Sequence, residues 1–286
     1  MFPIHLDLGF KVVHYYEGFY FFVSLLAAAW LVGLRLKKAG LDLEIYVGSL
    51  PWILLAAFLG ARIFHFLFWD VAAVQANPWG FFRLWEGGMS ITGGLAGGGL
   101  AGYLCLRRAK VDFFHYFAVA SPAILLGQAL GRVGCFLNGD AWGIPTQLPW
   151  GIALPRFGVR LPSLVLDQRF PSEAWLWSVR EGFTSPLAMA TVPLHPTQLY
   201  EFFGDLLLAG LVVWLVRSLR RTPGPWSRAL WLHLGGYSLL RFGLEFLHGD
   251  RDLTLWAGMT ALQIGLLAFG GLSVGLYAKA RGRAQA

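Results

Sequence analysis

The sequence predicts an all-α membrane protein, a bundle of about seven transmembrane helices with one long loop region outside the membrane. Of its 286 residues, 56% are hydrophobic and 14% are charged, and the mean hydropathy is +0.56, unlike a soluble domain. Seven apolar stretches are long enough to cross a bilayer, which takes roughly 20 residues per helix. The 13 Trp and nine Tyr suit the two membrane interfaces.

The seven expected spans follow one another from near the N-terminus. They cover about residues 17–35, 49–69, 89–106, 115–138, 199–217, 229–248 and 256–278. The first lacks the basic segment and cleavage site of a signal peptide, so we expect it to be retained. The third and fourth contain small-residue runs at 93–99 and 127–131, which let helices pack closely in lipid.

Basic clusters follow every second span. Their members are Arg35, Lys37, Lys38, Arg107, Arg108, Lys110, Arg217, Arg220, Arg221, Arg228, Lys279, Arg281 and Arg283. Because such clusters stay in the cytoplasm, we expect a multi-pass inner-membrane protein with its N-terminus outside and its C-terminus in the cytoplasm.

One connection, 139–198, is much longer than the others. It is polar and Pro-rich, yet Trp150, Trp175 and Trp177 favour contact with the lipid surface. We therefore expect a single integral-membrane domain over 1–286, with 139–198 as a periplasmic or interfacial insertion.

Composition argues against several other classes of function. The net charge is +7, but the Lys and Arg residues lie between apolar segments instead of forming the extended basic face of a nucleic-acid-binding protein. The two cysteines, Cys105 and Cys135, lie in apolar segments without metal-ligand spacing. We expect no disulfide framework, no metal site and no other cofactor.

Several charged residues lie inside the expected spans, where each costs a few kcal/mol and usually marks function. Either these charges neutralise one another in pairs, or they line a polar cavity. They are Arg62, Arg132, Glu201, Asp205, Arg241 and Glu245.

The sixth expected span carries the clearest pattern. Tyr237, Arg241, Glu245 and His248 are spaced by 4, 4 and 3 residues, which places them within a roughly 80° sector of a helix. We expect Glu245, one turn from Arg241, to hold its guanidinium in place.

The fourth expected span carries a second polar face. Arg132, Cys135 and Asn138 recur every three residues, and Asp140 follows directly. Asp140 is placed either to hold Arg132 or to take part in proton transfer. A guanidinium binds phosphate through bidentate hydrogen bonds, so two of them in an apolar protein indicate a phosphate that carries acyl chains.

The segments around these residues resemble the bacterial prolipoprotein diacylglyceryl transferases. Residues 131–140, GRVGCFLNGD, are similar to the family signature GRxGNFxNxE. Residues 84–90 (LWEGGMS), 142–146 (WGIPT) and 195–201 (HPTQLYE) match further family segments, as do the tyrosine, arginine and glutamate of the sixth span. Each string is weak alone, but their order and spacing over nearly the whole chain are specific.

The resemblance implies a reaction and two partners. The diacylglyceryl group of phosphatidylglycerol would pass to the lipobox cysteine thiol of a preprolipoprotein, forming a thioether and releasing glycerol phosphate. The implied catalytic residues are Arg132, Arg241, Glu245, Asp140, Tyr237, Thr92 and His248. The implied phosphatidylglycerol-binding residues are Arg132, Arg241, Asn138, Tyr16, Gln198, Glu201, Arg62 and Cys135.

This sequence departs from the family pattern at four positions. The histidine of the family's HGG motif is Thr92, the signature asparagine is Cys135, its glutamate is Asp140, and His248 stands where an arginine is expected. A threonine cannot act as an imidazole base, so the proton path implied by the resemblance is altered. The arginines that would bind the phosphate are kept.

Two other functions therefore remain open. A divergent paralogue would bind anionic phospholipid with altered or no transferase activity. A transporter would use the buried charges as a permeation path, although the two halves show no convincing repeat. The sequence leaves open the acceptor protein, the identity of the base and the oligomeric state.

Overall fold

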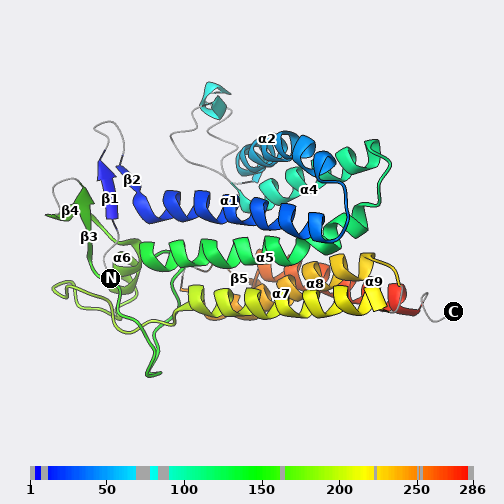
Figure 1. The fold of residues 1–286 in the computed structure, drawn as a ribbon. Helices are drawn as coiled ribbons and strands as arrows, with labels where there is room; N and C mark the ends of the chain where they lie inside the picture. Colours follow the sequence, from blue (N-terminus) through cyan, green and yellow to red (C-terminus); the bar gives the residue numbers. More distant parts are fainter. Residues whose placement is uncertain are drawn as a thin grey trace. The chain divides into compact units, whose positions relative to one another are not determined.

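The computed structural model describes residues 4–7, 12–68, 78–82, 90–161, 165–221, 224–249, 251 and 254–282. In these ranges the chain forms eight α-helices, a 3-10 helix η1 (Pro78–Phe82) and six short strands (Figure 1). Seven of the helices overlap the seven expected spans. They are α1 (Tyr15–Lys38), α2 (Leu43–Phe68), α4 (Ile91–Arg108), α5 (Phe113–Asn138), α7 (Thr197–Arg221), α8 (Ser227–Glu245) and α9 (Ala261–Gly282).

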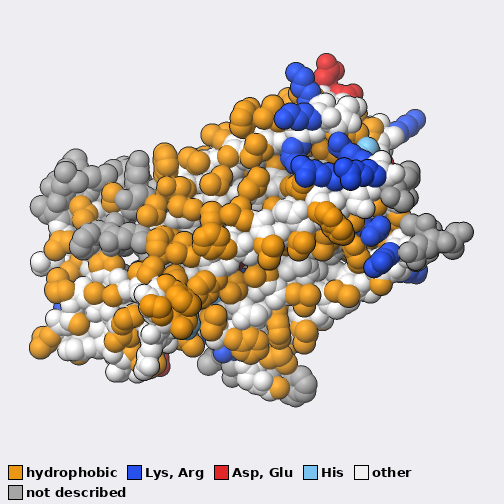
Figure 2. Space-filling view, turned by 60° about the horizontal axis from the view of Figure 1, so that its bottom comes forward, with side chains coloured by type: hydrophobic (Ala, Val, Ile, Leu, Met, Phe, Trp, Pro, Cys, Tyr) orange, Lys and Arg blue, Asp and Glu red, His pale blue; other side chains and the backbone are white. Residues whose placement is uncertain are grey.

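Five of these helices, α1, α2, α5, α7 and α9, are long and apolar enough to cross a membrane. Large apolar side chains are exposed along them: Trp30 by 65%, Trp52 by 63% and Trp214 by 67%. Figure 2 shows hydrophobic side chains over much of the face that it draws. Because water disfavours such a surface, the chain is a multi-pass membrane protein. Glycine-rich α4 is not among these five helices, and neither is α8, which carries the polar stripe. The expected count of seven spans therefore stays a prediction.

The chain divides into two compact units, unit 1 with residues 1–32 and 118–286, and unit 2 with residues 33–117. In unit 2, α2 packs directly against α4. A Cβ atom at Gly97 would overlap the carbonyl oxygen of Ala56, and one at Gly93 would overlap that of Gly60. These glycines of the predicted small-residue run therefore serve close packing.

Basic helix ends lie together within each unit. In unit 2 the Tyr116 hydroxyl, in the first turn of α5, donates a hydrogen bond to the Asp42 carbonyl at 3.2 Å, which joins the connection after α1 to the helix that follows α4. In unit 1 Arg228 Nη2, at the start of α8, donates to the Tyr277 hydroxyl near the end of α9 at 3.2 Å. Each unit thus gathers two of the predicted cytoplasmic clusters at one end.

In unit 1, α5, α7 and α8 share an apolar core. Leu125, Val212, Leu215 and Ala229 are all buried there, and α9 packs on α8. This core holds the three helices that carry the polar stripes in fixed positions.

The all-α description needs correcting in one respect. A four-stranded sheet has the order β2-β1-β3-β4, from β1 (Ile4–Asp7), β2 (Val12–His14), β3 (Phe157–Leu161) and β4 (Val165–Pro171). A two-stranded sheet joins β5 (Thr254–Trp256) to β6 (Met259–Thr260). Strand β1 runs parallel to β3, about 150 residues later, with Ile4 opposite Val159. The runs are too short to show a period, so pairing across the chain is invisible in the sequence.

The 139–198 connection also contains a short helix, α6 (Glu173–Arg180). Ser172 caps it by accepting a hydrogen bond from the Trp175 backbone amide at 3.4 Å. The expected loop insertion therefore contains regular secondary structure, namely strands and one helix.

Candidate functional site

The first part of the site lies where α5, α7 and α8 meet. Arg132 Nη2 on α5 donates to Glu201 Oε1 on α7 at 2.6 Å, and the Tyr237 hydroxyl on α8 donates to the same oxygen at 3.1 Å. Glu201 is 1% exposed. One buried carboxylate therefore ties together α5, α7 and α8.

The second part of the site follows one turn later along α8. Arg241 Nη2 lies 2.9 Å from Glu245 Oε2, so the predicted support of Arg241 by Glu245 is confirmed. Helix α8 ends at Glu245, so His248 does not extend the helical stripe as expected. Its backbone instead pairs with Gly143 in an isolated bridge, and its side chain is buried.

The signature segment at the end of α5 turns back toward α7. Asn138 Nδ2 donates to Asp140 Oδ2 at 3.1 Å. Between them Gly139 has φ +80°, a conformation that glycine adopts readily. Gln198 Nε2 donates to the Asp140 carbonyl at 2.5 Å. Asp140 is one expected partner for Arg132, but the ion pair of Arg132 is with Glu201, which the sequence does not suggest for this contact.

Backbone hydrogen bonds join three signature segments. The Gly143 amide donates to the His195 carbonyl at 3.1 Å, and the Ile144 amide donates to the Leu247 carbonyl at 2.8 Å. A Cβ at Gly143 would lie 2.5 Å from the His195 carbonyl oxygen, so only glycine fits. The segments that resemble the family at 142–146 and 195–201 are thus positioned against each other and against the end of α8.

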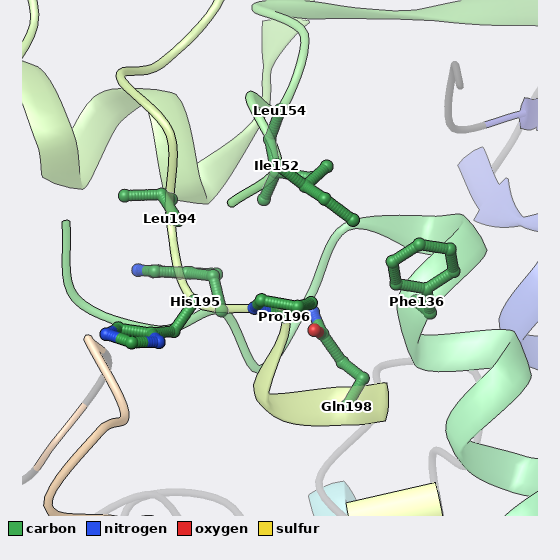
Figure 3. Close-up of a pocket in the computed structure, with 8 residues that line it drawn as sticks. Phe136, Ile152, Leu154, Leu194, His195, Pro196 and Gln198 are labelled. Atoms are coloured by element: carbon green, nitrogen blue, oxygen red, sulfur yellow. The ribbon is translucent and has the colours of Figure 1, made fainter. Parts of the chain in front are cut away.

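A small pocket borders this junction (Figure 3). Pro196 lies between Leu194 and Phe136 in this view, and the Gln198 side chain extends toward Pro196 from the first turn of α7. His195 Nδ1 lies 3.1 Å from the Tyr200 hydroxyl. That contact supports a packing role for His195.

Other predicted site residues are placed differently. Arg62 is 2% exposed and belongs to unit 2, where its Nε donates to the Phe81 carbonyl at 2.9 Å. Cys135 Sγ lies 4.0 Å from Arg132 Nη1. Thr92 lies in the first turn of α4 and Tyr16 in that of α1, and the side chains of both fall outside the described residues.

Sequence reasoning left two buried features out of the site. Asp205 lies one turn after Glu201 on α7 and is 0% exposed. The buried Ser121 hydroxyl lies 2.6 Å from His233 Nδ1. Asp205 is four residues from Glu201, and His233 is four residues before Tyr237, so helical spacing offered a signal for both. Nothing in the sequence singles out Ser121.

Within the described ranges, the site contains a donor and an acceptor that are buried without a hydrogen-bond partner. Arg241 Nη1 and Glu201 Oε2 are buried and have no hydrogen-bond partner among the described residues. Buried polar atoms normally have partners, so the free guanidinium nitrogen favours an anionic ligand. In the same ranges no group of three or more His, Cys, Asp or Glu residues is placed to hold a metal ion.

Comparison with known proteins agrees with this geometry. A family model described as prolipoprotein diacylglyceryl transferase matches residues 3–278. The chain is 31% identical over 263 residues to a phosphatidylglycerol–prolipoprotein diacylglyceryl transferase of Pseudoalteromonas atlantica, covering 92% of this chain and 81% of that protein. Proteins of the same name from Legionella pneumophila (31% over 276 residues, 96% and 90% covered) and Erwinia tasmaniensis (32% over 272 residues, 92% and 86% covered) are similar.

Proposed function

The chain belongs to the prolipoprotein diacylglyceryl transferase family, and we propose that the arginines of α5 and α8 bind the phosphate of phosphatidylglycerol during the transfer. The protein is a transferase that moves the diacylglyceryl group of phosphatidylglycerol to prolipoproteins. The acceptor atom we propose is the sulfur of the lipobox cysteine.

The reaction replaces a carbon–oxygen bond by a carbon–sulfur bond and transfers one proton. The sulfur bonds to the glyceryl carbon of the diacylglyceryl group, and the bond from that carbon to the phosphate oxygen breaks with its electron pair going to the oxygen. The thiol proton leaves to a base or to the departing phosphate. Glycerol phosphate is the second product.

Arg132 and Arg241 would stabilise the negative charge that grows on the departing phosphate, and electrostatic stabilisation of this kind often supplies most of an enzyme's rate acceleration. The observation that carries this proposal is that each guanidinium has a buried carboxylate partner, Glu201 at 2.6 Å and Glu245 at 2.9 Å. Each carboxylate holds its guanidinium beside the place proposed for the phosphate, so only part of the guanidinium has to turn when the phosphate arrives. We expect the two guanidiniums to face a common cavity open to lipid.

The remaining predicted residues have supporting roles in this proposal. Asn138 and Gln198 fix the turn after α5 through Asp140. Tyr16, Cys135 and Arg62 stay predicted contacts of the phospholipid. Asp140, Glu245 and His248 are the candidate bases.

We also propose the placement in the membrane. The basic helix ends would face the cytoplasm of a bacterial inner membrane, with the N-terminus and 139–198 in the periplasm. The seven long helices would all span, forming one membrane domain with 139–198 as its insertion. Gathering of basic clusters at one end within each unit supports this arrangement.

The departures at Thr92 and Cys135 favour one alternative, a paralogue that binds anionic phospholipid without transfer. Incubating the purified protein with phosphatidylglycerol and a lipobox peptide separates the two. We expect the peptide mass to rise by one diacylglyceryl group, and not to rise when its cysteine is serine. Phospholipid binding without any mass change would support the alternative.

A further inference from the structure

Asp205 is a buried carboxyl group that the proposed mechanism does not use. It lies on α7 inside a membrane-spanning helix and is 0% exposed. Neither of its carboxyl oxygens has a hydrogen-bond partner among the described residues. An ionised carboxylate in such a place is costly, so the group needs either a proton or a partner.

The nearest candidate partner is Glu201, one turn earlier on the same helix. Residues four apart on a helix have Cβ atoms roughly 5–6 Å apart, within reach of a carboxyl–carboxylate hydrogen bond after a change of rotamer. Glu201 Oε1 is taken by Arg132 and Tyr237, whereas Glu201 Oε2 has no partner among the described residues. A protonated Asp205 would therefore supply the donor that Glu201 Oε2 lacks.

The surrounding charges favour a proton on Asp205. Within α5, within α7 up to residue 216 and within α8 from residue 229, the Arg, Lys, Asp and Glu side chains are two arginines, Arg132 and Arg241, and three carboxylic acids, Glu201, Asp205 and Glu245. With all three acids ionised, the cluster would carry a net charge of −1 before an anionic lipid arrives. Loss of a proton from the third acid to water is therefore disfavoured, and the cluster is neutral when Asp205 keeps its proton.

Neutral titratable groups also face this cluster from neighbouring helices. The Tyr237 hydroxyl on α8 donates to Glu201 Oε1 at 3.1 Å, and Cys135 Sγ on α5 lies 4.0 Å from Arg132 Nη1. Buried His233 on α8 contacts Ser121. None of these side chains is an Arg or Lys, so Arg132 and Arg241 remain the permanent positive charges of the cluster.

Binding of a phosphate changes what Glu201 needs. Arg132 must turn at least part of its guanidinium from Glu201 to the phosphate, which leaves a buried carboxylate short of donors. We propose that Asp205 is a positioning residue of the phospholipid site, which carries a proton and donates a hydrogen bond to Glu201 when Arg132 engages the phosphate. This inference rests on the proposed phosphatidylglycerol site and deepens it.

Two substitutions separate the proton from the hydrogen bond. Asp205→Asn keeps a donor that does not titrate, whereas Asp205→Leu has a similar size and no donor. The exposed Glu173 at the start of α6 provides the matched control, Glu173→Gln. The measurement is the affinity of each purified protein, in phosphatidylcholine nanodiscs, for dioctanoyl phosphatidylglycerol between about pH 6 and pH 9.

At the acidic end we expect Asp205→Asn to bind within about twofold of the natural protein and Asp205→Leu to bind at least about tenfold more weakly, the size of a lost hydrogen bond to a charged group. As the pH rises, the natural protein and Glu173→Gln should lose affinity by up to about tenfold per pH unit once the linked proton is lost. Asp205→Asn should stay nearly constant.

The inference is overturned if Asp205→Asn follows the pH profile of the natural protein, or if Asp205→Leu binds as well as Asp205→Asn. If Asp205→Leu does not fold, the pH profile of Asp205→Asn against that of the natural protein decides the question by itself. A natural protein that shows no preference for phosphatidylglycerol over phosphatidylcholine would instead refute the proposed phospholipid site itself.

Discussion

Arg132 and Glu201 form an ion pair of 2.6 Å between α5 and α7, and Tyr237 donates to the same carboxylate oxygen from α8. A single carboxylate thus orients the arginine of the family signature and fixes the helix that carries Arg241. The geometry of the proposed phosphate site and the stability of unit 1 are therefore coupled at Glu201.

Glu201→Gln should destabilise the protein, because it leaves the partly buried Arg132 guanidinium without a counter-ion. We expect the free energy of unfolding to fall by about 3 kcal/mol, as for other broken buried pairs. Thermal unfolding in detergent measures this, and phosphatidylglycerol should raise the melting temperature of the variant more than that of the natural protein. Glu173→Gln is the control, and an unchanged melting temperature for Glu201→Gln would contradict the assigned pair.

Arg132→Lys and Arg241→Lys should each lower transfer to a lipobox peptide by about a hundredfold or more, since an ammonium cannot make the bidentate contacts of a guanidinium. Arg228→Lys is a matched control, because Arg228 lies at the start of α8, at the opposite end from Arg241, and contacts Tyr277 of α9. It should keep nearly full activity. Equal losses in all three variants would show a general effect of arginine removal rather than a phosphate site.

Thr92→His should raise the rate of transfer if the missing imidazole limits proton removal from the thiol. Without a side-chain base the rate should climb toward roughly pH 8.5, the ordinary pKa of a cysteine thiol. With histidine at position 92 the rise should move to lower pH. The readout is the initial rate of peptide modification across that pH range, and an unchanged profile in the variant would place the base elsewhere.

Residue accessibility in cells tests the topology. Leu187 in the long connection is 88% exposed, and Arg281 lies in the last turn of α9. A membrane-impermeant thiol reagent should label Leu187→Cys in intact cells and Arg281→Cys only after lysis, in a background with Cys105 and Cys135 replaced by serine. Labelling of position 281 in intact cells would show that the orientation is the reverse of the proposed one.

Close packing of α2 on α4 predicts opposite effects for two nearby glycines. Gly97→Ala should lower the free energy of unfolding by roughly 1–3 kcal/mol, because its methyl group would overlap the Ala56 carbonyl. Gly99→Ala has nothing within 4 Å of the added methyl and should be neutral or stabilise by up to about 1 kcal/mol. Both are read from unfolding in detergent, and equal effects would mean that the helices pack through another face.

The sequence predicted the helices because each apolar stretch is long and continuous. It also predicted the Arg241–Glu245 pair, since that contact is local to one helical turn. The choice of Glu201 over Asp140 as the partner of Arg132 depends on how α5 and α7 are placed, which a single sequence does not encode in any local pattern. For the same reason, the sequence does not reveal the pairing of β1 with β3 or the contact of Ser121 with His233.

The turn at Glu181 and Gly182 is exposed, but the chain on its two sides stays joined. The Ser178 and Thr184 hydroxyls lie 2.7 Å apart, and Arg156 makes backbone and side-chain contacts with 186–189. The two sides further pack through α5 against α7 and α8 in one apolar core. A single cut of the backbone at Gly182 would therefore leave two fragments that remain one folded particle, since the forces that hold them together do not run through the peptide bond at that turn.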